Sequence, residues 1–187
     1  SYELDENGSR LTGSKLLLDL PWEPGPGHNG GVLKVGPDNN LYITIGDMIS
    51  SSDNQSQPYE TLAQNFQAGK EVDGRAGILR ITQNGQPVGN GLLGSNHPLD
   101  LYYSYGIKNS FGIDFDPITG MLWDTENGPD FGDEVNLVEP GFNSGWKKIQ
   151  GIWYVDAAMG KSEVAPMNPS ELVDFNSKGK YSSPEFT

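Results

Sequence analysis

The sequence contains no cysteine, and this absence excludes disulfide bonds, thiolate metal sites and cysteine nucleophiles together. Basic side chains are scarce, because 12 lysines and arginines stand against 25 aspartates and glutamates, for a formal net charge of −13. Such a surface repels polyanions, which makes nucleic-acid binding a poor hypothesis. No stretch approaches the roughly 18 consecutive apolar residues of a membrane span. We therefore expect neither a nucleic-acid partner nor a membrane span.

Turn-forming residues are abundant instead. The 187 residues include 25 glycines and 13 prolines, about a fifth of the chain against roughly an eighth in average usage. Hydrophobic residues make up only 35%, yet there are 8 tyrosines, 7 phenylalanines and 4 tryptophans. Short strands joined by many turns have this composition, so we predict an all-β fold.

Two stretches of the chain repeat each other with one gap. Residues 31–47 and 112–128 each contain an apolar strand, a turn rich in Pro, Asn or Gly, and a second strand with an aromatic residue. That pattern is typical of a β-hairpin. A strand ending that runs into an Asn-Gly turn also recurs, at residues 4–8 and 81–85, again at a spacing of about 80 residues. A further strand of this kind is expected at residues 135–138.

Recurrence of this kind indicates a β-propeller, and the alternative is a chance similarity of two hairpins in a β-sandwich. At roughly 60 to 80 residues per blade the chain holds about two to three blades, whereas a closed propeller needs at least four. We therefore expect part of a propeller, or several copies that assemble to close the ring. The approximate units are residues 1–26 (end of one blade), 27–104 (a blade with a long insertion) and 105–187 (the next blade).

The sequence also predicts the secondary structure of two stretches outside the repeats. Apolar residues at helical spacing predict one short helix near residues 59–69, with Gly69 as its C-terminal cap. Prolines and glycines within residues 155–180 predict mostly irregular structure there.

His28 is one of only two histidines, and it lies among glycines in residues 26–31, immediately before the first repeated hairpin. Glycines let the backbone turn sharply and let a ligand come close, and imidazole is well suited to proton transfer near neutral pH. The alternative is a loop histidine hydrogen-bonded to the backbone, which the residue pattern alone favours. His97 precedes Pro98 in a polar loop and is interpreted as structural.

Lys108 and Asn109 precede the second repeated hairpin, at the place that His28 occupies before the first. One cation and one amide suit an anionic or carbonyl-bearing ligand. A surface lysine is the usual alternative. Equivalent loops of a propeller face the same end of the molecule, and this favours a shared site.

Four carboxylates lie within residues 125–134, interrupted by glycine and proline. Their mutual repulsion is costly unless they are solvated or share a cation. Carbonyl oxygens exposed at Gly128-Pro129 are suitable calcium ligands, although the spacing is not that of an EF-hand. The residue types alone do not decide between a solvated acidic surface and a calcium site.

A series of motifs follows a fixed order along nearly the whole chain: His28-Asn29-Gly30-Gly31, Gly36-Pro37-Asp38, Leu41-Tyr42, Ile45-Gly46-Asp47, Gly77-Ile78-Leu79-Arg80-Ile81, Tyr105-Gly106-Ile107-Lys108-Asn109, Glu126-Asn127-Gly128-Pro129, Asp133-Glu134-Val135-Asn136 and Asn143-Ser144-Gly145-Trp146. In this order the sequence resembles the soluble glucose/sorbosone dehydrogenase family, the pyrroloquinoline quinone (PQQ)-dependent aldose sugar dehydrogenases. That resemblance implies a six-bladed propeller, of which this chain is the central part, about half of the ring.

The resemblance also implies an activity, the PQQ-dependent oxidation of an aldose at its anomeric carbon to the lactone. His28 matches the family's general base, and hydride passes from the sugar carbon to the quinone C5 of PQQ. Lys108 and Asn109 match the Arg-Asn pair that polarises the quinone oxygen. Together with Asn127, these three residues are the expected cofactor-binding set.

Calcium is the second cofactor that the resemblance implies. The backbone carbonyls of Gly128 and Pro129 match those that link the protein to PQQ through Ca²⁺, which acts as a Lewis acid toward the quinone oxygens. A further structural calcium in relatives uses a glutamate and a later carbonyl, which fall on Glu134 and Ser144.

Three features depart from the family pattern. Lys108 replaces an arginine, which keeps the charge but loses the planar fork. Gly27 stands where some members have an aspartate that orients the histidine. The later cationic residues that grip the PQQ carboxylates in relatives belong to blades outside this chain, so the chain alone is expected to hold an incomplete cofactor site.

The expected partners are an aldose, an electron acceptor that the sequence does not identify, and the rest of the propeller or further copies that close the ring. Family members are typically exported, which implies a periplasmic or extracellular location. The alternative function is a non-catalytic propeller that binds a protein or a carbohydrate. Retention of His28, Lys108-Asn109 and Gly128-Pro129 favours the enzyme, because a binding scaffold does not need all three.

Overall fold

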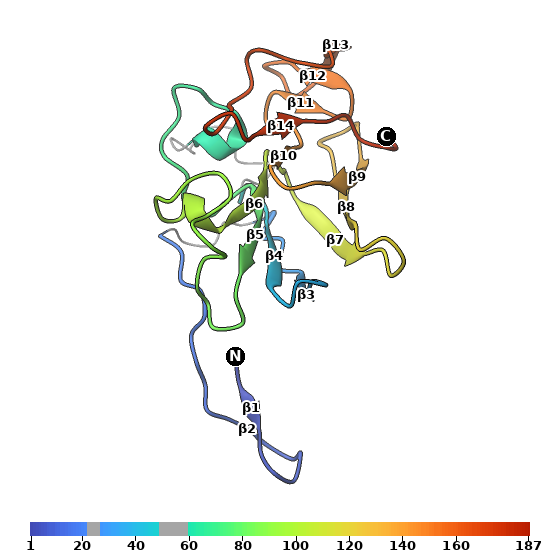
Figure 1. Cartoon of the computed structure of the whole chain (residues 1–187). Helices are drawn as coiled ribbons and strands as arrows, with labels where there is room; N and C mark the ends of the chain where they lie inside the picture. The colour runs from blue at the N-terminus through green and yellow to red at the C-terminus, as the bar shows by residue number, and fades with distance from the viewer. Residues whose placement is uncertain (22–26, 49–59) are drawn as a thin grey trace.

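The computed structural model describes residues 1–21, 27–48 and 60–187. Short strands and two 3₁₀ helices build these ranges, which confirms the predicted all-β class (Figure 1). In chain order the elements are β1 (Glu3–Leu4), β2 (Leu11–Thr12), β3 (Leu33–Val35), β4 (Leu41–Ile45), η1 (Leu62–Gln64), β5 (Gly77–Ile81), η2 (Leu99–Leu101), β6 (Tyr102–Tyr105), β7 (Ser110–Phe115), β8 (Leu122–Glu126), β9 (Glu134–Val138), β10 (Phe142–Asn143), β11 (Ile149–Gln150), β12 (Trp153–Val155), β13 (Lys161–Val164) and β14 (Lys180–Tyr181).

The largest sheet has six strands in the order β14-β10-β6-β5-β4-β3. Strands β3 to β6 pair antiparallel with their sequence neighbours, whereas β10 and β14 continue the sheet from β6 in parallel. The hairpin predicted within residues 31–47 forms the β3 edge, where Leu33 lies opposite Ile43. Its turn contains Asn39 in the left-handed conformation, with φ of 62°, which asparagine tolerates better than most residues.

A second sheet contains β7, β8 and β9 in antiparallel order. Asp114 lies opposite Trp123, and Leu122 lies opposite Val138. The hairpin predicted within residues 112–128 and the strand predicted at residues 135–138 are therefore confirmed. The register of β7 shifts between Ser110 and Gly112, immediately after Lys108-Asn109. Such irregularities often re-aim the side chains beside them.

The prediction of mostly irregular structure over residues 155–180 is confirmed, and the strand residues within it are Val155, Lys161–Val164 and Lys180. Strands β11, β12 and β13 form a three-stranded antiparallel sheet, in which Trp153 lies opposite Val164, and β14 joins the large sheet. The aromatic and β-branched residues of β12 favour a strand. The turn between β12 and β13 contains Met159 at a φ of 63°. Gly160 therefore belongs to the turn of a hairpin.

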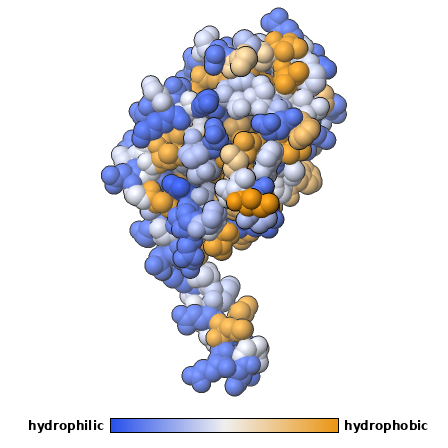
Figure 2. Space-filling model, turned by 45° about the vertical axis from the view of Figure 1, so that its right-hand side comes forward, coloured by the Kyte–Doolittle hydropathy of each residue, from blue (hydrophilic) through white to orange (hydrophobic). Residues whose placement is uncertain are grey.

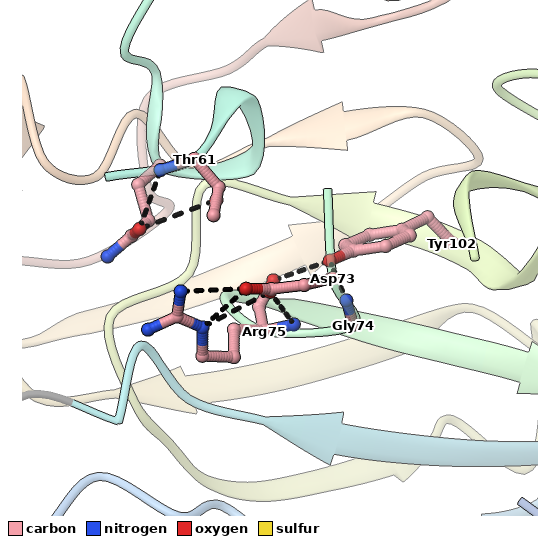
Figure 3. Close-up of polar contacts among 6 residues, drawn as sticks. Thr61, Asp73, Gly74, Arg75 and Tyr102 are labelled. Carbon is pink, nitrogen blue, oxygen red and sulfur yellow. Dashed lines mark hydrogen bonds and ion pairs between the residues drawn. The ribbon is translucent and has the colours of Figure 1, made fainter. Parts of the chain in front are cut away.

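The short helix expected near residues 59–69 is a single 3₁₀ turn, η1, and Tyr59 lies outside the described residues. Thr61 caps its start, and the Thr61 N–H donates to Gln64 Oε1 at 3.1 Å (Figure 3). Asn65, and not Gly69, ends the turn, with a left-handed φ of 62°. The spacing of the apolar residues correctly predicted helical geometry, but the left-handed conformation of Asn65 ends the helix after one turn.

Strands β4 and β5 of the large sheet are buried on both faces, since successive residues of a strand point to opposite faces and nearly all of theirs are buried. Tyr42 and Ile78 belong to one apolar cluster, and their neighbours Ile43 and Leu79 belong to another. The Tyr42 cluster includes residues of β7, β8 and β9. Within it, the rings of Tyr42 and Phe115 meet edge to face, with centroids 4.9 Å apart. This cluster joins the two sheets.

The turn that leads into β5 is held by a buried polar network (Figure 3). The Arg75 guanidinium contacts the Asp73 carboxylate through Nε at 2.9 Å and Nη2 at 2.7 Å. The Tyr102 hydroxyl accepts the N–H of Gly74 at 3.0 Å and donates to the carbonyl of Arg75 at 2.7 Å. Ala76 N–H then donates to the carbonyl of Gly46, so this turn supports the end of β4.

The surface drawn in Figure 2 is mostly polar, with scattered apolar patches. Strands β1 and β2 pair as a small hairpin at the end of an N-terminal arm that projects from the body (Figure 1). In the part of the chain that the structure describes, no helix is long and apolar enough to cross a membrane.

Candidate functional site

The C-terminal ends of β4, β6, β8 and β10 lie close together. Strands β4 and β6 run in the same direction, because each is antiparallel to β5, and β10 is parallel to β6. Main-chain hydrogen bonds join the segments that follow: Asp47 N–H to the Lys108 carbonyl at 2.8 Å, and Asn127 N–H to the Asn109 carbonyl at 3.3 Å. Predicted site residues far apart in sequence are thereby brought together.

His28 lies beside Asp47 at the end of β4. Its Nδ1 is 2.7 Å from Asp47 Oδ1, and the Asp47 side chain is only 1% exposed. The backbone makes this approach possible, because a Cβ at Gly46 would lie 2.0 Å from the His28 carbonyl oxygen. His28 itself adopts a left-handed φ of 55°. The glycine-rich loop is therefore fitted tightly against the strand end.

The partners of His28 determine how its ring can act. A carboxylate is an acceptor only, so we assign the ring proton to Nδ1, where it donates to Asp47. Nε2 then carries the lone pair, and Lys108 Nζ lies 3.3 Å from it. A histidine held in this tautomer can accept a proton at Nε2.

Lys108 is a buried cation, with 3% of its surface exposed. Burial lowers its pKa below the ordinary value, while nearby carboxylates, Asp47 first among them, oppose that shift. Its backbone N–H donates to Glu126 Oε1 in a short hydrogen bond. The ammonium group therefore lies between the imidazole and a set of acidic side chains.

Asn109 and Asn127 continue the network away from His28. Asn109 Oδ1 accepts the N–H of Gly30 at 3.3 Å, and Asn109 Nδ2 donates to Asn127 Oδ1 at 3.0 Å. Asn127 Nδ2 donates to the carbonyl of Gly128 at 3.0 Å. Five predicted residues thus share one continuous region: His28, Lys108, Asn109, Asn127 and Gly128. Pro129 follows directly in the chain.

The other predicted pair, Glu134 and Ser144, is buried behind this region. Ser144 Oγ lies 2.8 Å from Glu134 Oε2 and 2.9 Å from Glu126 Oε2. Burial raises the pKa of Glu134 to about 7 and that of Glu126 well above its ordinary value, and repulsion between the two adds to the shift in Glu126. Two carboxyl groups this close require a proton or a cation to offset their repulsion.

The four carboxylates of residues 125–134 do not converge on one point. Asp130 and Asp133 are exposed, and Asp133 Oδ1 accepts the N–H of Gly128 at 2.9 Å. Within residues 1–21, 27–48 and 60–187, no three histidine, aspartate or glutamate side chains are arranged to hold a metal ion. A calcium ion here would need backbone carbonyls, and oxygen donors of that kind are the ligands calcium prefers.

The donor set fits both groups that the sequence suggests. Gly128 is packed so closely that a Cβ would lie 1.8 Å from the Phe131 carbonyl oxygen, and its own carbonyl keeps a second lone pair beside the one bound to Asn127. An ammonium group and amide N–H groups at Lys108 and Asn109 suit a carbonyl-bearing anion. A hollow of about 290 Å³ is lined by Asn127 together with Glu126 and Asp133, so a small group has room beside Asn127.

Sequence reasoning missed two residues of this region, Asp47 and Trp146. Gly27 lacks the carboxylate that some relatives place before the histidine, but Asp47 supplies one from the segment that follows β4. Trp146 also reaches this carboxylate, and its indole Nε1 donates to Asp47 Oδ2 at 2.7 Å. Asp47 and Trp146 both lie in the ordered series of motifs, and that position was the sequence signal that could have identified them as site residues. His97 is exposed and contacts Asp100 at 3.1 Å, outside the region described here.

Comparison with known proteins finds similarity to sugar dehydrogenases. It is 34% identical over 148 residues to quinoprotein glucose dehydrogenase B of Acinetobacter calcoaceticus, covering 73% of this chain and 29% of that protein. It is 30% identical over 145 residues to an aldose sugar dehydrogenase of Escherichia coli, covering 76% of this chain and 35% of that protein. The solved PQQ-bound aldose sugar dehydrogenase of Streptomyces coelicolor matches with a TM-score of 0.58 and 27% identity, over 87% of this chain and 42% of that one.

The matched region spans about a third of the length of these two curated relatives. Residues 1–178 match the Glucose / Sorbosone dehydrogenase family. With nearly the whole chain matched and two relatives at 30% identity or more, the chain belongs to the Glucose / Sorbosone dehydrogenase family.

Proposed function

We propose that this chain carries part of the active site of a PQQ-dependent dehydrogenase that oxidises an aldose at its anomeric carbon to the lactone. The observation that supports it best is the His28-Asp47 pair, which leaves His28 Nε2 as a proton acceptor 3.3 Å from the Lys108 ammonium. The names of two relatives, a quinoprotein glucose dehydrogenase and a PQQ-bound aldose sugar dehydrogenase, support the cofactor and the substrate class.

In this proposal His28 is the general base. Its Nε2 takes the proton of the anomeric hydroxyl, while Nδ1–H stays hydrogen-bonded to Asp47, which stabilises the imidazolium that forms. When bound, PQQ supplies the two-electron acceptor for the hydride that leaves the sugar carbon. The sugar thereby loses one proton and one hydride and becomes the lactone.

Lys108 and Asn109 stabilise negative charge in this proposal. Both present N–H donors at the same strand ends as His28, and a buried cation stabilises developing charge more strongly than one in water. The ammonium group has three donors, so Lys108 can donate to a carbonyl oxygen when the sugar hydroxyl takes its place at His28 Nε2. Asn127 holds Asn109 through the amide contact of 3.0 Å and completes the cofactor-binding set.

Calcium is proposed at two places. The carbonyls of Gly128 and Pro129 would hold the ion that polarises the cofactor, and Glu134 with the Ser144 carbonyl would hold a structural ion. The buried Glu126-Glu134 pair supports the second place, because a cation relieves the repulsion of two carboxylates.

We further propose that residues 27–104 and 105–187 are successive blades of a six-bladed propeller, and that residues 1–26 end the blade before them. The remaining blades, or other copies, would complete the ring and supply the groups that bind the PQQ carboxylates. A periplasmic or extracellular location is proposed from the family alone.

The test uses the full-length protein, titrated with PQQ in the presence of calcium and then assayed for aldose-dependent dye reduction. We expect saturable PQQ binding and dye reduction that requires both PQQ and the sugar. Absence of PQQ binding together with absence of aldose-dependent reduction would overturn the proposed function. His97→Ala serves as a matched control, since this exposed histidine lies outside the site and its loss should leave turnover unchanged.

A further inference from the structure

The carboxylate of Asp47 is held from two sides by two different rings. Its Oδ1 lies 2.7 Å from His28 Nδ1, and its Oδ2 accepts the indole N–H of Trp146 at 2.7 Å. Trp146 is 2% exposed and Asp47 is 1% exposed. Hydrogen bonds to a charged group in such a buried place are stronger and more directional than in water.

The backbone of Trp146 is anchored on both sides of its side chain. Its N–H donates to the carbonyl of Gly106 at 2.9 Å. Its carbonyl accepts Asn65 Nδ2 at 2.7 Å, and the N–H of Lys147 donates to the carbonyl of Gln64 at 2.8 Å. Gly106 lies two residues before Lys108, so the indole is fixed to the same segment that carries the cation.

The anchor at Asn65 is itself part of a closed amide pair. Asn65 Nδ2 also donates to Asn143 Oδ1 at 2.9 Å, and Asn143 Nδ2 returns a bond to Asn65 Oδ1 at 2.8 Å. Gly145 N–H donates to Asn143 Oδ1 at 3.0 Å. A buried polar network with its members paired in this way keeps a single geometry, and it leads directly to Trp146.

The main chain of Asp47 is fixed as well, through its N–H bond to the Lys108 carbonyl at 2.8 Å. The two ring contacts limit rotation of the carboxylate about its side-chain bonds. An Asp47 carboxylate that rotated away from His28 would leave the imidazole free to take the other tautomer, with the proton on Nε2. The indole N–H opposes that rotation because it holds the second oxygen.

We propose that Trp146 is a positioning residue for proton abstraction, which acts through Asp47 to keep His28 in the tautomer with an unprotonated Nε2. Trp146 touches neither the sugar nor the reacting atoms in this role. The Lys108 ammonium also lies over the indole ring, 5.7 Å from its centroid. The same side chain therefore fixes both neighbours of the His28 ring. This inference rests on the proposed function, in which His28 is the base.

The test compares Trp146→Phe with wild-type full-length protein, and Trp153→Phe is the matched control. Trp153 packs on Phe131, with centroids 6.3 Å apart, and is outside this network. We expect Trp146→Phe to lower kcat about 10- to 100-fold, a part of the roughly 10²- to 10⁴-fold effect of a general base. KM for the sugar should change less than twofold. Unchanged kcat in Trp146→Phe would overturn the inference.

A second measurement does not depend on turnover. Long-range ¹H–¹⁵N spectra report the tautomer of each histidine, and the His28 signal is assigned by its loss in His28→Gln. We expect Nδ1-protonated His28 in the wild type and a mixture of tautomers in Trp146→Phe, with His97 unchanged in both. An identical His28 spectrum in the two proteins would overturn the inference.

The two measurements also separate this inference from the proposed function. A wild type that binds no PQQ and oxidises no aldose refutes the proposed function, and the spectra still decide the role of Trp146 toward His28. If Trp146→Phe does not fold, benzothienylalanine at position 146 keeps the ring shape and removes the N–H donor. The same tautomer mixture is then expected, and a wild-type spectrum contradicts the inference.

Discussion

Asp124 on β8 lies directly opposite Asn136 on β9, and both side chains are fully buried. Within the described residues, Asp124 Oδ2 and Asn136 Oδ1 have no hydrogen-bond partner. Two acceptors cannot bond to each other, whereas a protonated carboxyl group offers a donor. Burial raises the pKa of Asp124 to about 7, although a hydrogen bond from Ser110 opposes the shift. The fold therefore favours the neutral form of Asp124.

We expect Asp124→Asn to remove a pH dependence of stability. A carboxyl group whose pKa rises on folding contributes its full stability below the unfolded value of 3.8, and this contribution is lost as the pH rises toward the folded value. The free energy of unfolding of the wild type should fall by roughly 2–4 kcal/mol from this group between pH 4 and pH 8. Asparagine is neutral throughout, so that part of the fall should vanish.

Denaturant unfolding measured across this pH range checks the expectation. Asp130→Asn is the control, because Asp130 is exposed and its loss should keep the wild-type pH dependence. Equal pH dependence in Asp124→Asn and the wild type would show that Asp124 is not the group responsible.

The turn before β5 gives a second prediction. Tyr102→Phe removes the hydroxyl that bridges the Gly74 N–H and the Arg75 carbonyl, and it leaves both groups buried without this partner. We expect a loss of about 1–3 kcal/mol in the free energy of unfolding. Tyr103→Phe keeps the ring that packs on Tyr42 and should cost less. Equal unfolding midpoints for the two variants would contradict this account.

Gly46 is predicted to be essential for the placement of His28. A Cβ at this position would lie 2.0 Å from the His28 carbonyl oxygen, and overpacking of this kind costs about 1–3 kcal/mol. We expect Gly46→Ala to lower both the melting temperature and the aldose-dependent turnover of the full-length protein. In Gly112→Ala the nearest atom, Thr125 Oγ1, is 3.4 Å away, so both quantities should stay near wild type. Equal melting temperatures and equal turnover in Gly46→Ala and Gly112→Ala would contradict this prediction.

Calcium should stabilise the protein through Glu134. A ligand that binds the folded state at 100 times its Kd adds about 2.7 kcal/mol, so calcium should raise the melting temperature and a chelator should reverse the effect. Glu134→Gln removes a charged ligand and should reduce this shift, whereas Glu139→Gln, at an exposed position, should retain it. A calcium-induced shift of wild-type size in Glu134→Gln would remove this residue from the site.

Local chemistry accounts for what the sequence could predict. The turns after Val35 and Phe115 contain the Pro, Asn and Gly residues that hairpins require, and the structure has both hairpins. The grouping of His28 with Lys108 follows from their equivalent places before these hairpins. The association was predictable because it depends on repeats rather than on individual contacts.

Contacts between distant segments account for what was missed. The Asp47 carboxylate reaches His28 because Gly46 lets two backbones touch, and a sequence pattern does not record such an approach. The indole of Trp146 is 99 residues from Asp47. The helix near residue 62 ended early because Asn65 adopts a left-handed conformation, where its amide also joins the network under Trp146.

The central claim is that His28 takes the proton of the sugar, and single-turnover kinetics tests it most directly. Full-length protein loaded with PQQ and calcium is mixed rapidly with excess aldose, and reduction of the bound quinone is followed by absorbance. The account predicts reduction at least about 10²-fold slower in His28→Ala than in the wild type, with His97→Ala unchanged. Equal rates in His28→Ala and the wild type, with equal PQQ occupancy, would contradict it.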